Sequence, residues 1–455
     1  MATMAGIPYF EVEFDKEGEI SDQAQVKALK TALKPGDPTD LIVLSHGWNN
    51  DMAEARELYG KFLTSFKTRL DAGFPGVKDR KFAVMAVLWP SKKFAEKELI
   101  PSGAAGASGI PDKAILEELD SLKGFFGATK SAAVAANVAL DKAKTLVPKL
   151  ENSPAARREF ADIIRSLVPK ENAKGTEGAE DASADFFKLD GEEVMKRLEK
   201  PAPIAIPSRQ GGGAGVGPAA GPGSSGSGGA AGLGSFFSGV KSAALKVLNF
   251  TTYYQMKNRA AVVGAKGVSP ILRSFKGQFS NLRIHAVGHS FGGRLVTAVA
   301  HAMGKSGTQT PAVPIDSLSL LQAAFSHYGF AEKWDGSHAG AFRAVLTDKL
   351  VKGPIMVTYT VNDKAVGLAY PLASLTAGQV AAGLGDRNDK YGGIGRNGAQ
   401  KTPEAVEGKL LPVGKAYELQ AGRIYNLQAD AFVKDHGDVG GEEVAYAVLA
   451  AIART

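Results

Sequence analysis

The chain has 455 residues and a formal net charge of +7, and 44% of its residues are hydrophobic. This composition excludes a wholly disordered or fibrous protein, and the length allows one large domain or two to three ordinary ones. Because the chain has no cysteine, disulfides, thiolate metal sites and a cysteine nucleophile are excluded as well.

The first ninety residues have the pattern of an α/β protein. Residues 41–44 and 82–88 are short apolar runs, which are typical of strands buried on both faces. An alternating strand precedes them, and apolar residues at helical spacing lie between them. The predicted strands are 8–14, 41–44 and 82–88, and the predicted helices are 22–33 and 53–70.

Strand-like runs almost disappear between residues 91 and 280, and helical spacing takes their place. Ser153-Pro154 is typical of a helix start, with serine as the N-cap and proline at the first helical position. Residues 211–234 consist of Gly, Ser, Ala and Pro with few large apolar residues, so we expect a mobile loop or linker there. A longer helix is predicted to follow, with Val240, Val247 and Tyr254 on one face.

The α/β pattern returns after residue 281. Predicted strands at 282–287, 318–324, 355–361 and 424–427 alternate with helices such as 292–303 and 442–451. Such alternation predicts a doubly wound, mostly parallel sheet covered on both faces. We therefore expect one core from residues 1–90 and 281–455, with residues 91–280 as a large, mainly helical insertion.

The strongest local signal is the G-x-S-x-G sequence Gly288-His289-Ser290-Phe291-Gly292. It follows the predicted strand LRIHAV and precedes a predicted helix, which is the context in which this motif carries a nucleophile. The tight turn predicts a strained backbone at Ser290, and the helix N-terminus favours negative charge that develops there. Ser290 is therefore the expected nucleophile.

This motif, together with S-H-G-W-N-N at 45–50 and L-W-P-S at 88–91, resembles the α/β-hydrolase superfamily of serine hydrolases. Within it, these motifs resemble a group of uncharacterised bacterial esterase- and lipase-like proteins. The resemblance implies the α/β-hydrolase fold and a triad in the chain order Ser, acid, His. Of the seven histidines, only His436 comes late enough in the chain to be that base.

The resemblance also implies the remaining site residues. Asp363, which follows the strand at 355–361, matches the acid position of the family, and Asp335, Asp386 and Asp389 remain alternatives. His46-Gly47-Trp48 resembles the H-G-x loop of the family. The backbone N–H groups of Trp48 and Phe291 are therefore the expected oxyanion donors.

The chain departs from the usual family pattern in the position of its insertion, which lies before the nucleophile strand. Residues 364–422 also separate the expected acid from the last strand. Within the insertion, Phe236-Phe237 and the run LNFTTYYQM suit a lid helix over an acyl-binding groove. The alternative is a helix that packs on the core.

The expected function is the hydrolysis of carboxylic esters through an acyl-enzyme, with a small-molecule or lipid substrate and no metal or organic cofactor. One alternative is a lipid-directed lipase or phospholipase exported as an effector, since the positive charge and the apolar lid candidate suit peripheral membrane contact. Another is a non-catalytic binding module on a hydrolase scaffold. The sequence has no patterned basic and aromatic patch for nucleic acid, and it leaves the oligomeric state open.

The N-terminal segment MATMAGIPYFEVEFDKEGEI lacks a basic region followed by an apolar stretch, so no signal peptide is expected. No apolar run reaches the roughly eighteen residues that a membrane span needs. We expect a cytoplasmic protein, or one exported by a route without an N-terminal signal.

Overall fold

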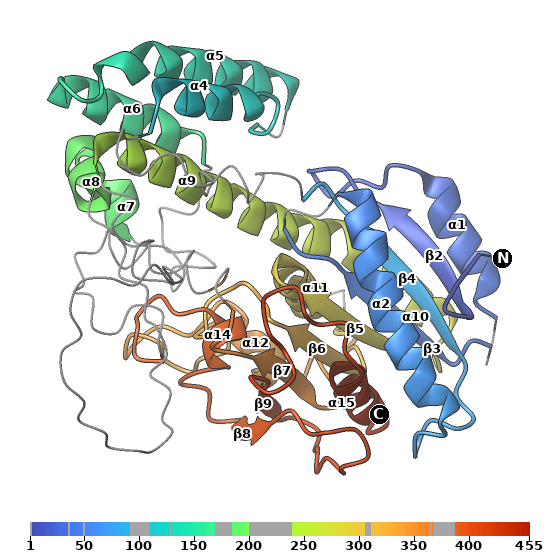
Figure 1. The fold of residues 1–455 in the computed structure, drawn as a ribbon. Helices are drawn as coiled ribbons and strands as arrows, with labels where there is room; N and C mark the ends of the chain where they lie inside the picture. Colours follow the sequence, from blue (N-terminus) through green and yellow to red (C-terminus); the bar gives the residue numbers. More distant parts are fainter. Residues whose placement is uncertain are drawn as a thin grey trace, which may run out of the picture.

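The computed structural model describes residues 2–34, 37–48, 51–91, 110–127, 129–168, 184–199, 239–304, 311–363, 366 and 387–455. A nine-stranded sheet with the order β1-β2-β4-β3-β5-β6-β7-β9-β8 forms the centre of this part of the chain (Figure 1). Its strands are β1 (Thr3–Met4), β2 (Ile7–Glu13), β3 (Asp40–Ser45), β4 (Phe82–Leu88), β5 (Arg283–His289), β6 (Ser317–Leu321), β7 (Ile355–Tyr359), β8 (Ala405–Lys409) and β9 (Ile424–Gln428). β1 pairs antiparallel with β2, and every other neighbouring pair is parallel. The predicted α/β class with a mostly parallel sheet is confirmed.

The helices that cover the sheet or join its strands are α1 (Gln23–Ala32), α2 (Met52–Asp71), α10 (Ser269–Gln278), α11 (Phe291–Ala302), α12 (Arg343–Thr347), α14 (Ile394–Asn397) and α15 (Glu442–Ile452). Between β4 and β5 the chain forms α4 (Asp112–Ser121), α5 (Lys130–Leu146), the short 3₁₀ turn Val147–Lys149, α6 (Pro154–Ser166), α7 (Ala184–Lys188), α8 (Gly191–Leu198) and α9 (Val240–Val262). A π-helical turn, Val263–Val268, joins α9 to α10.

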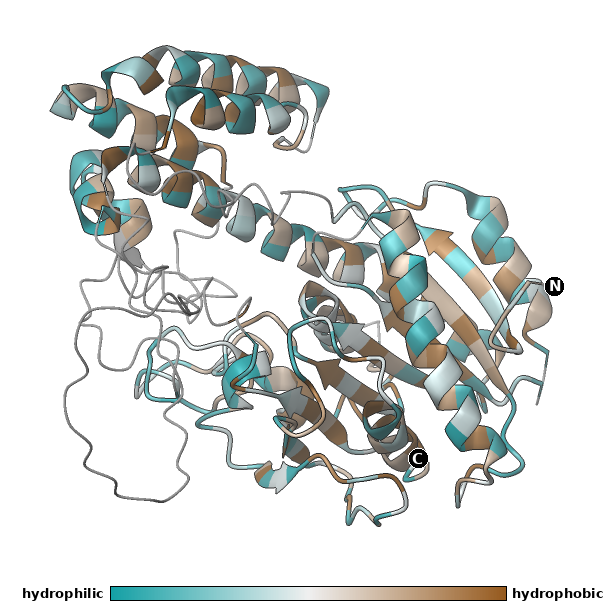
Figure 2. Ribbon diagram, in the orientation of Figure 1, coloured by the Kyte–Doolittle hydropathy of each residue, from teal (hydrophilic) through white to brown (hydrophobic). Residues whose placement is uncertain are grey.

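Alternate residues of the central strands enter two different hydrophobic cores. In β3, Ile42 and Leu44 pack in the core that includes α2 and α15, whereas Leu41 and Val43 pack in the core that includes α10 and α11. A parallel strand that is buried on both faces needs such a continuous apolar run. The hydropathy colouring follows this arrangement, with mainly hydrophobic strands between helices whose outer faces are hydrophilic (Figure 2).

The strand order of the sheet reverses between β3 and β5. After β3 the chain crosses to β4 on one side, whereas β5, β6, β7 and β9 follow one another on the other side. Loops at the carboxyl ends of the two strands next to such a reversal diverge and leave a crevice, where ligands of open α/β sheets bind. His46-Gly47 follows β3 and Ser290 follows β5, so both lie at this point.

Helices α4 to α8 form a separate group beside the sheet, and α9 runs from this group to α11 (Figure 1). Phe250 and Tyr254 of α9 contact the Phe186 ring of α7, with ring centroids 4.5 and 6.3 Å apart. Tyr253 contacts Phe291 of α11, at 5.1 Å. The aromatic stripe of α9 is thus buried among these elements. Residues 211–234 and Phe236-Phe237 lie outside the described residues.

The strand predictions failed at both edges of the sheet. β1 has two residues, and β8, with the sequence AVEGK, contains no run of alternating or continuous apolar residues. Edge strands bury few side chains, so their sequences carry little hydrophobic pattern. None of the described helices is long and apolar enough to cross a membrane.

Candidate active site

Ser290 lies at the turn between β5 and α11, in a backbone conformation that few non-glycine residues adopt. Its φ and ψ angles are 56° and −125°. The Ser290 N–H donates to the carbonyl of Leu321 at 3.1 Å, and the Ser290 carbonyl accepts from Gly293 and Ala324, both at 2.9 Å. Such strain persists only where surrounding contacts hold it, and it is common at functional sites. The strained turn predicted from the sequence is present.

Three glycines let the chain pass close to Ser290. A Cβ atom on Gly47 would lie 2.5 Å from the Cβ of Ser290, and Cβ atoms on Gly288 and Gly292 would collide with the carbonyls of Gly292 and Ser45. Only a residue without a side chain avoids these overlaps. The glycines of the motif therefore bring β5, α11 and the end of β3 into contact at the serine.

The hydroxyl of Ser290 belongs to a hydrogen-bonded series with His436 and Asp363. The Oγ atom of Ser290 lies 2.8 Å from Nε2 of His436, and Nδ1 of His436 lies 2.8 Å from Oδ2 of Asp363. An ionised Asp363 accepts from Nδ1–H, which leaves the lone pair of Nε2 free to accept from the Ser290 hydroxyl. The structure thus brings together three residues that the sequence assigned to one site.

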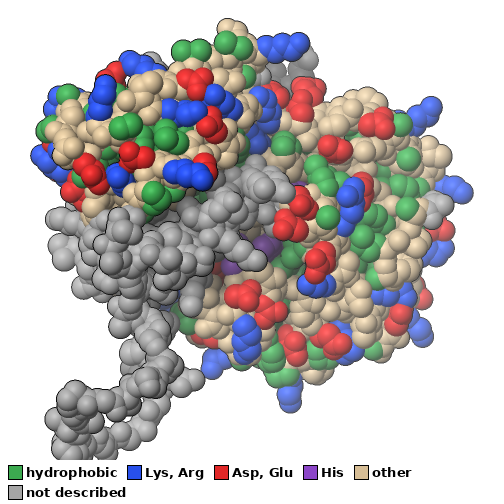
Figure 3. All heavy atoms as spheres, turned by 45° about the horizontal axis from the view of Figure 1, so that its top comes forward, with side chains coloured by type: hydrophobic (Ala, Val, Ile, Leu, Met, Phe, Trp, Pro, Cys, Tyr) green, Lys and Arg blue, Asp and Glu red, His purple; other side chains and the backbone are tan. Residues whose placement is uncertain are grey.

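Asp363 is buried in the loop after β7, whereas the His436 side chain is 23% exposed. The second carboxylate oxygen of Asp363 accepts from the N–H of Val366 at 2.9 Å. These two hydrogen bonds satisfy the buried carboxylate and orient it toward the imidazole. Histidine side chains reach the surface in a small area of the face that Figure 3 shows.

The turn after β3 is held next to Ser290 by a buried histidine. The Nε2 atom of His46 lies 3.3 Å from the backbone nitrogen of Trp89, and the Trp89 indole N–H donates to the His46 carbonyl at 3.1 Å. Burial lowers the pKa of His46 to about 4, so the ring is neutral at pH 7. We assign His46 to positioning the Gly47-Trp48 turn.

Trp48 and Phe291, whose backbone N–H groups are the expected oxyanion donors, contact each other through their side chains. Their ring centroids are 5.9 Å apart. Phe291 is the first residue of α11, so its backbone N–H has no acceptor within the helix. Trp48 directly follows Gly47, which approaches the Ser290 hydroxyl. Both residues therefore belong to the two turns that meet at Ser290.

The alternative acids have other partners. Asp335 binds the Nδ1 atom of the exposed His338 at 2.7 Å. One carboxylate oxygen of Asp389 accepts from the N–H of Tyr391 at 3.0 Å within a turn. Asp386 lies outside the described residues. Asp363 is therefore the carboxylate that reaches His436.

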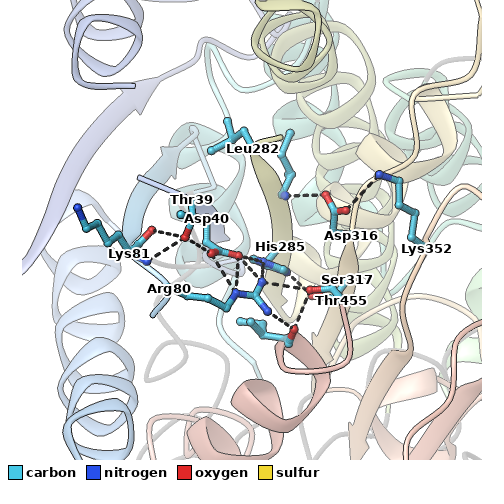
Figure 4. Close-up of polar contacts among 12 residues, drawn as sticks. Thr39, Asp40, Arg80, Lys81, Leu282, His285, Asp316, Ser317, Lys352 and Thr455 are labelled. Carbon is cyan, nitrogen blue, oxygen red and sulfur yellow. Dashed lines mark hydrogen bonds and ion pairs between the residues drawn. The ribbon is translucent and has the colours of Figure 1, made fainter. Parts of the chain in front are cut away.

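A second set of Ser, His and Asp side chains, which the sequence did not reveal, occurs at the amino ends of the central strands (Figure 4). The Nδ1 atom of His285, in β5, lies 2.8 Å from Oγ of Ser317, and its Nε2 atom lies 2.8 Å from Oδ1 of Asp40. All three side chains are buried, and Arg80 forms an ion pair with Asp40. Ser317 is the first residue of β6 and is 1% exposed, so it lies within the sheet and not in a turn after a strand. This set joins β3, β5 and β6.

Asp40 is charged within this cluster. Burial alone would raise the pKa of Asp40, but hydrogen bonds from His285 and Arg80 outweigh that effect and hold the pKa below its ordinary value. Arg80 also donates to the carbonyl of Ile452 at 2.8 Å and to Thr455 at 3.1 Å, so the same cation fastens α15 to the sheet.

Asp40→Asn is expected to lower the free energy of unfolding by about 3 kcal/mol, because it leaves the half-buried Arg80 without its carboxylate. Urea denaturation measures this loss. Asp71→Asn is the matched control, since Asp71 pairs with Lys67 at the surface, where an ion pair contributes about 0.5 kcal/mol. Equal denaturation midpoints for the two variants would contradict a stabilising role for Asp40.

Compared with known proteins, the chain matches no family model, no curated protein and no solved structure. The functional conclusion therefore depends on the geometry of Ser290, His436 and Asp363.

Proposed function

We propose that this chain is a serine hydrolase of the α/β-hydrolase type that cleaves carboxylic esters through an acyl-enzyme. The observation that carries the proposal is the series from Ser290 Oγ through His436 to Asp363, with two hydrogen bonds of 2.8 Å. Nucleophile, base and orienting acid within hydrogen-bond reach of one another are the signature of nucleophilic catalysis. In this proposal, the helices between β4 and β5 are a cap insertion.

The arrangement of the sheet supports the proposal. The nucleophile follows a central strand at the reversal of strand order, where open α/β sheets bind their ligands. The acid follows β7, and the base follows β9, which pairs with β7. The three loops therefore meet at the carboxyl edge of the sheet, in the chain order Ser, Asp, His.

In the first step, Ser290 Oγ attacks the ester carbonyl while its proton moves to Nε2 of His436. Asp363 stabilises the resulting imidazolium through Nδ1–H. The N–H groups of Phe291 and Trp48 are the donors proposed for the oxyanion. When the tetrahedral intermediate collapses, the bond from carbon to the alkoxy oxygen breaks, and the proton on Nε2 passes to the departing alcohol.

In the second step, water attacks the acyl-enzyme and transfers a proton to Nε2 of His436. The bond between the acyl carbon and Ser290 Oγ then breaks, and Oγ takes that proton back. The products are a carboxylic acid and the free enzyme, and neither step consumes a further reactant.

Labelling with a fluorophosphonate probe tests this proposal most directly. We expect one probe per chain at pH 7, and mass spectrometry should locate it on Ser290. A series of nitrophenyl esters from acetate to palmitate then reports acyl preference, and release of fatty acid from liposomes identifies a lipid-directed enzyme. A folded protein that the probe does not label would contradict the proposal and favour a binding module.

Asp363→Asn is expected to lower kcat by about 10³- to 10⁴-fold with a small change in KM. The asparagine amide can donate to Nδ1, which stabilises the tautomer with a proton on Nε2, and that tautomer cannot accept the serine proton. Steady-state hydrolysis of nitrophenyl acetate measures the loss.

Asp389→Asn is the matched control for this change, because Asp389 is also a buried carboxylate with a backbone partner but does not contact His436. We expect it to retain turnover. If the two variants lost turnover equally, Asp363 would not be the acid.

A further inference from the structure

His289, the residue immediately before Ser290, makes a hydrogen bond that the proposed mechanism does not use. Its Nε2 atom lies 2.7 Å from the backbone carbonyl oxygen of His436. A carbonyl oxygen only accepts, so Nε2 of His289 carries the hydrogen and Nδ1 has the lone pair. The two imidazole rings are 4.8 Å apart and tilted by 44°.

The Nε2–H group of His289 remains a donor over the whole neutral pH range. Its side chain is buried. Burial and the charge of the nearby His436 lower the pKa of His289 to about 3. A neutral imidazole with Nε2 bonded to a carbonyl has one tautomer, so the ring acts as a fixed donor and not as a proton carrier.

The bond from His289 is one of several hydrogen bonds that hold the loop carrying His436. This loop runs from the end of β9 to the start of α15, and Gly437, Gly440 and Gly441 follow the histidine. Its beginning is fastened to the loop after β7, because the Asn362 side chain donates to the carbonyls of Asp430 and Val433, at 3.2 and 2.9 Å. His436 lies three residues beyond Val433.

We infer that His289 is a positioning residue that fixes the backbone of His436 relative to Ser290. Because His289 and Ser290 are consecutive, the hydrogen bond ties the base directly to the turn of the nucleophile. The Nε2 atom of His436 then stays 2.8 Å from Ser290 Oγ, in the geometry that proton transfer requires. This inference rests on the proposed function, since it assigns His289 to the same reaction.

Two variants separate the hydrogen bond from the packing of the ring. His289→Gln keeps an N–H donor at a similar distance from the backbone, whereas His289→Met fills a similar volume without a donor. We expect His289→Met to lower kcat for nitrophenyl acetate by about 10- to 100-fold, as small misplacements of catalytic groups do. KM should change less than about twofold, and His289→Gln should recover most of kcat.

Several outcomes would overturn the inference. Wild-type turnover in the Met variant, or an equal loss in the Met and Gln variants at equal melting temperatures, would mean that the donor is not needed. Long-range ¹H–¹⁵N spectra of the unmodified protein test it without any variant. We expect His289 as the Nε2–H tautomer at pH 7, and the Nδ1–H tautomer would exclude the bond. If the wild type resists the fluorophosphonate probe while His289 has the expected tautomer, the proposed function fails and the bond is only structural.

Discussion

Replacement of Ser290 by alanine is expected to lower ester turnover by about 10⁴-fold or more and to abolish fluorophosphonate labelling. The variant loses the only atom that bonds to the substrate in the proposed mechanism. The fold should persist, because the backbone contacts of Ser290 with Leu321, Gly293 and Ala324 do not involve its side chain. Turnover of nitrophenyl acetate, with the far-ultraviolet dichroism of both proteins, measures the effect.

Ser317→Ala is the matched control for Ser290→Ala. Ser317 also hydrogen-bonds to a histidine that binds an aspartate, with both distances at 2.8 Å. Ser317 is buried at the amino end of β6, away from Ser290. Loss of its hydroxyl should therefore lower the free energy of unfolding by about 1 kcal/mol and leave labelling of the folded protein intact. Labelling that survived in Ser290→Ala and disappeared in Ser317→Ala would reverse the assignment of the two sets.

Acidification from pH 7 to pH 5 is expected to destabilise the protein strongly. Four of the seven histidines, His46, His285, His289 and His327, are buried. Burial lowers the pKa of each of them, to about 4 for His46 and about 3 for His289 and His327. Folding therefore keeps the imidazoles of His46, His289 and His327 neutral at pH values where the unfolded chain protonates them.

The sign of the effect follows from proton binding. Below a pH of about 6.5 the unfolded state binds more protons than the folded state, so stability falls as the pH falls. Each histidine whose pKa falls to about 3 or 4 contributes up to about 1.4 kcal/mol per pH unit, so His46, His289 and His327 together approach about 4 kcal/mol per pH unit near pH 5. Since domains are stable by about 5–15 kcal/mol, we expect acid unfolding close to pH 5. Urea denaturation at a series of pH values measures the slope.

Two substitutions test the origin of this slope. His327→Gln removes one buried imidazole and should reduce the slope by about 1.4 kcal/mol per pH unit near pH 5. His338→Gln changes a histidine whose side chain is 74% exposed, and it should leave the slope unchanged. A flat stability profile between pH 7 and pH 5 would contradict the neutral state of His46, His289 and His327.

The amino-acid pattern by itself determined the class of the fold and the central strands. Runs such as 82–88 coincide with β4 because a strand buried on both faces needs continuous apolar residues. The edge strand β8 escaped prediction because its pairing with β9 depends on backbone groups, which carry no sequence signal. The closeness of Gly47 to Ser290 likewise depends on the pairing of β3 with β5, strands that lie more than two hundred residues apart in the chain.

The sequence alone predicted Ser290 as the nucleophile, because its strand, turn and helix are contiguous in the chain and the glycines of the turn are needed there for local steric reasons. It also proposed His436 and Asp363, but only through a resemblance in chain order. The tertiary structure decided that these two side chains meet, across 73 residues, because β7 and β9 end on the same side of the sheet.

The sequence held no signal for the second Ser-His-Asp set, in which Asp40 and His285 are 245 residues apart. It also gave no hint of the bond from His289 to His436. Hydrogen bonds between distant residues depend on register and burial, which arise only when the whole sheet forms.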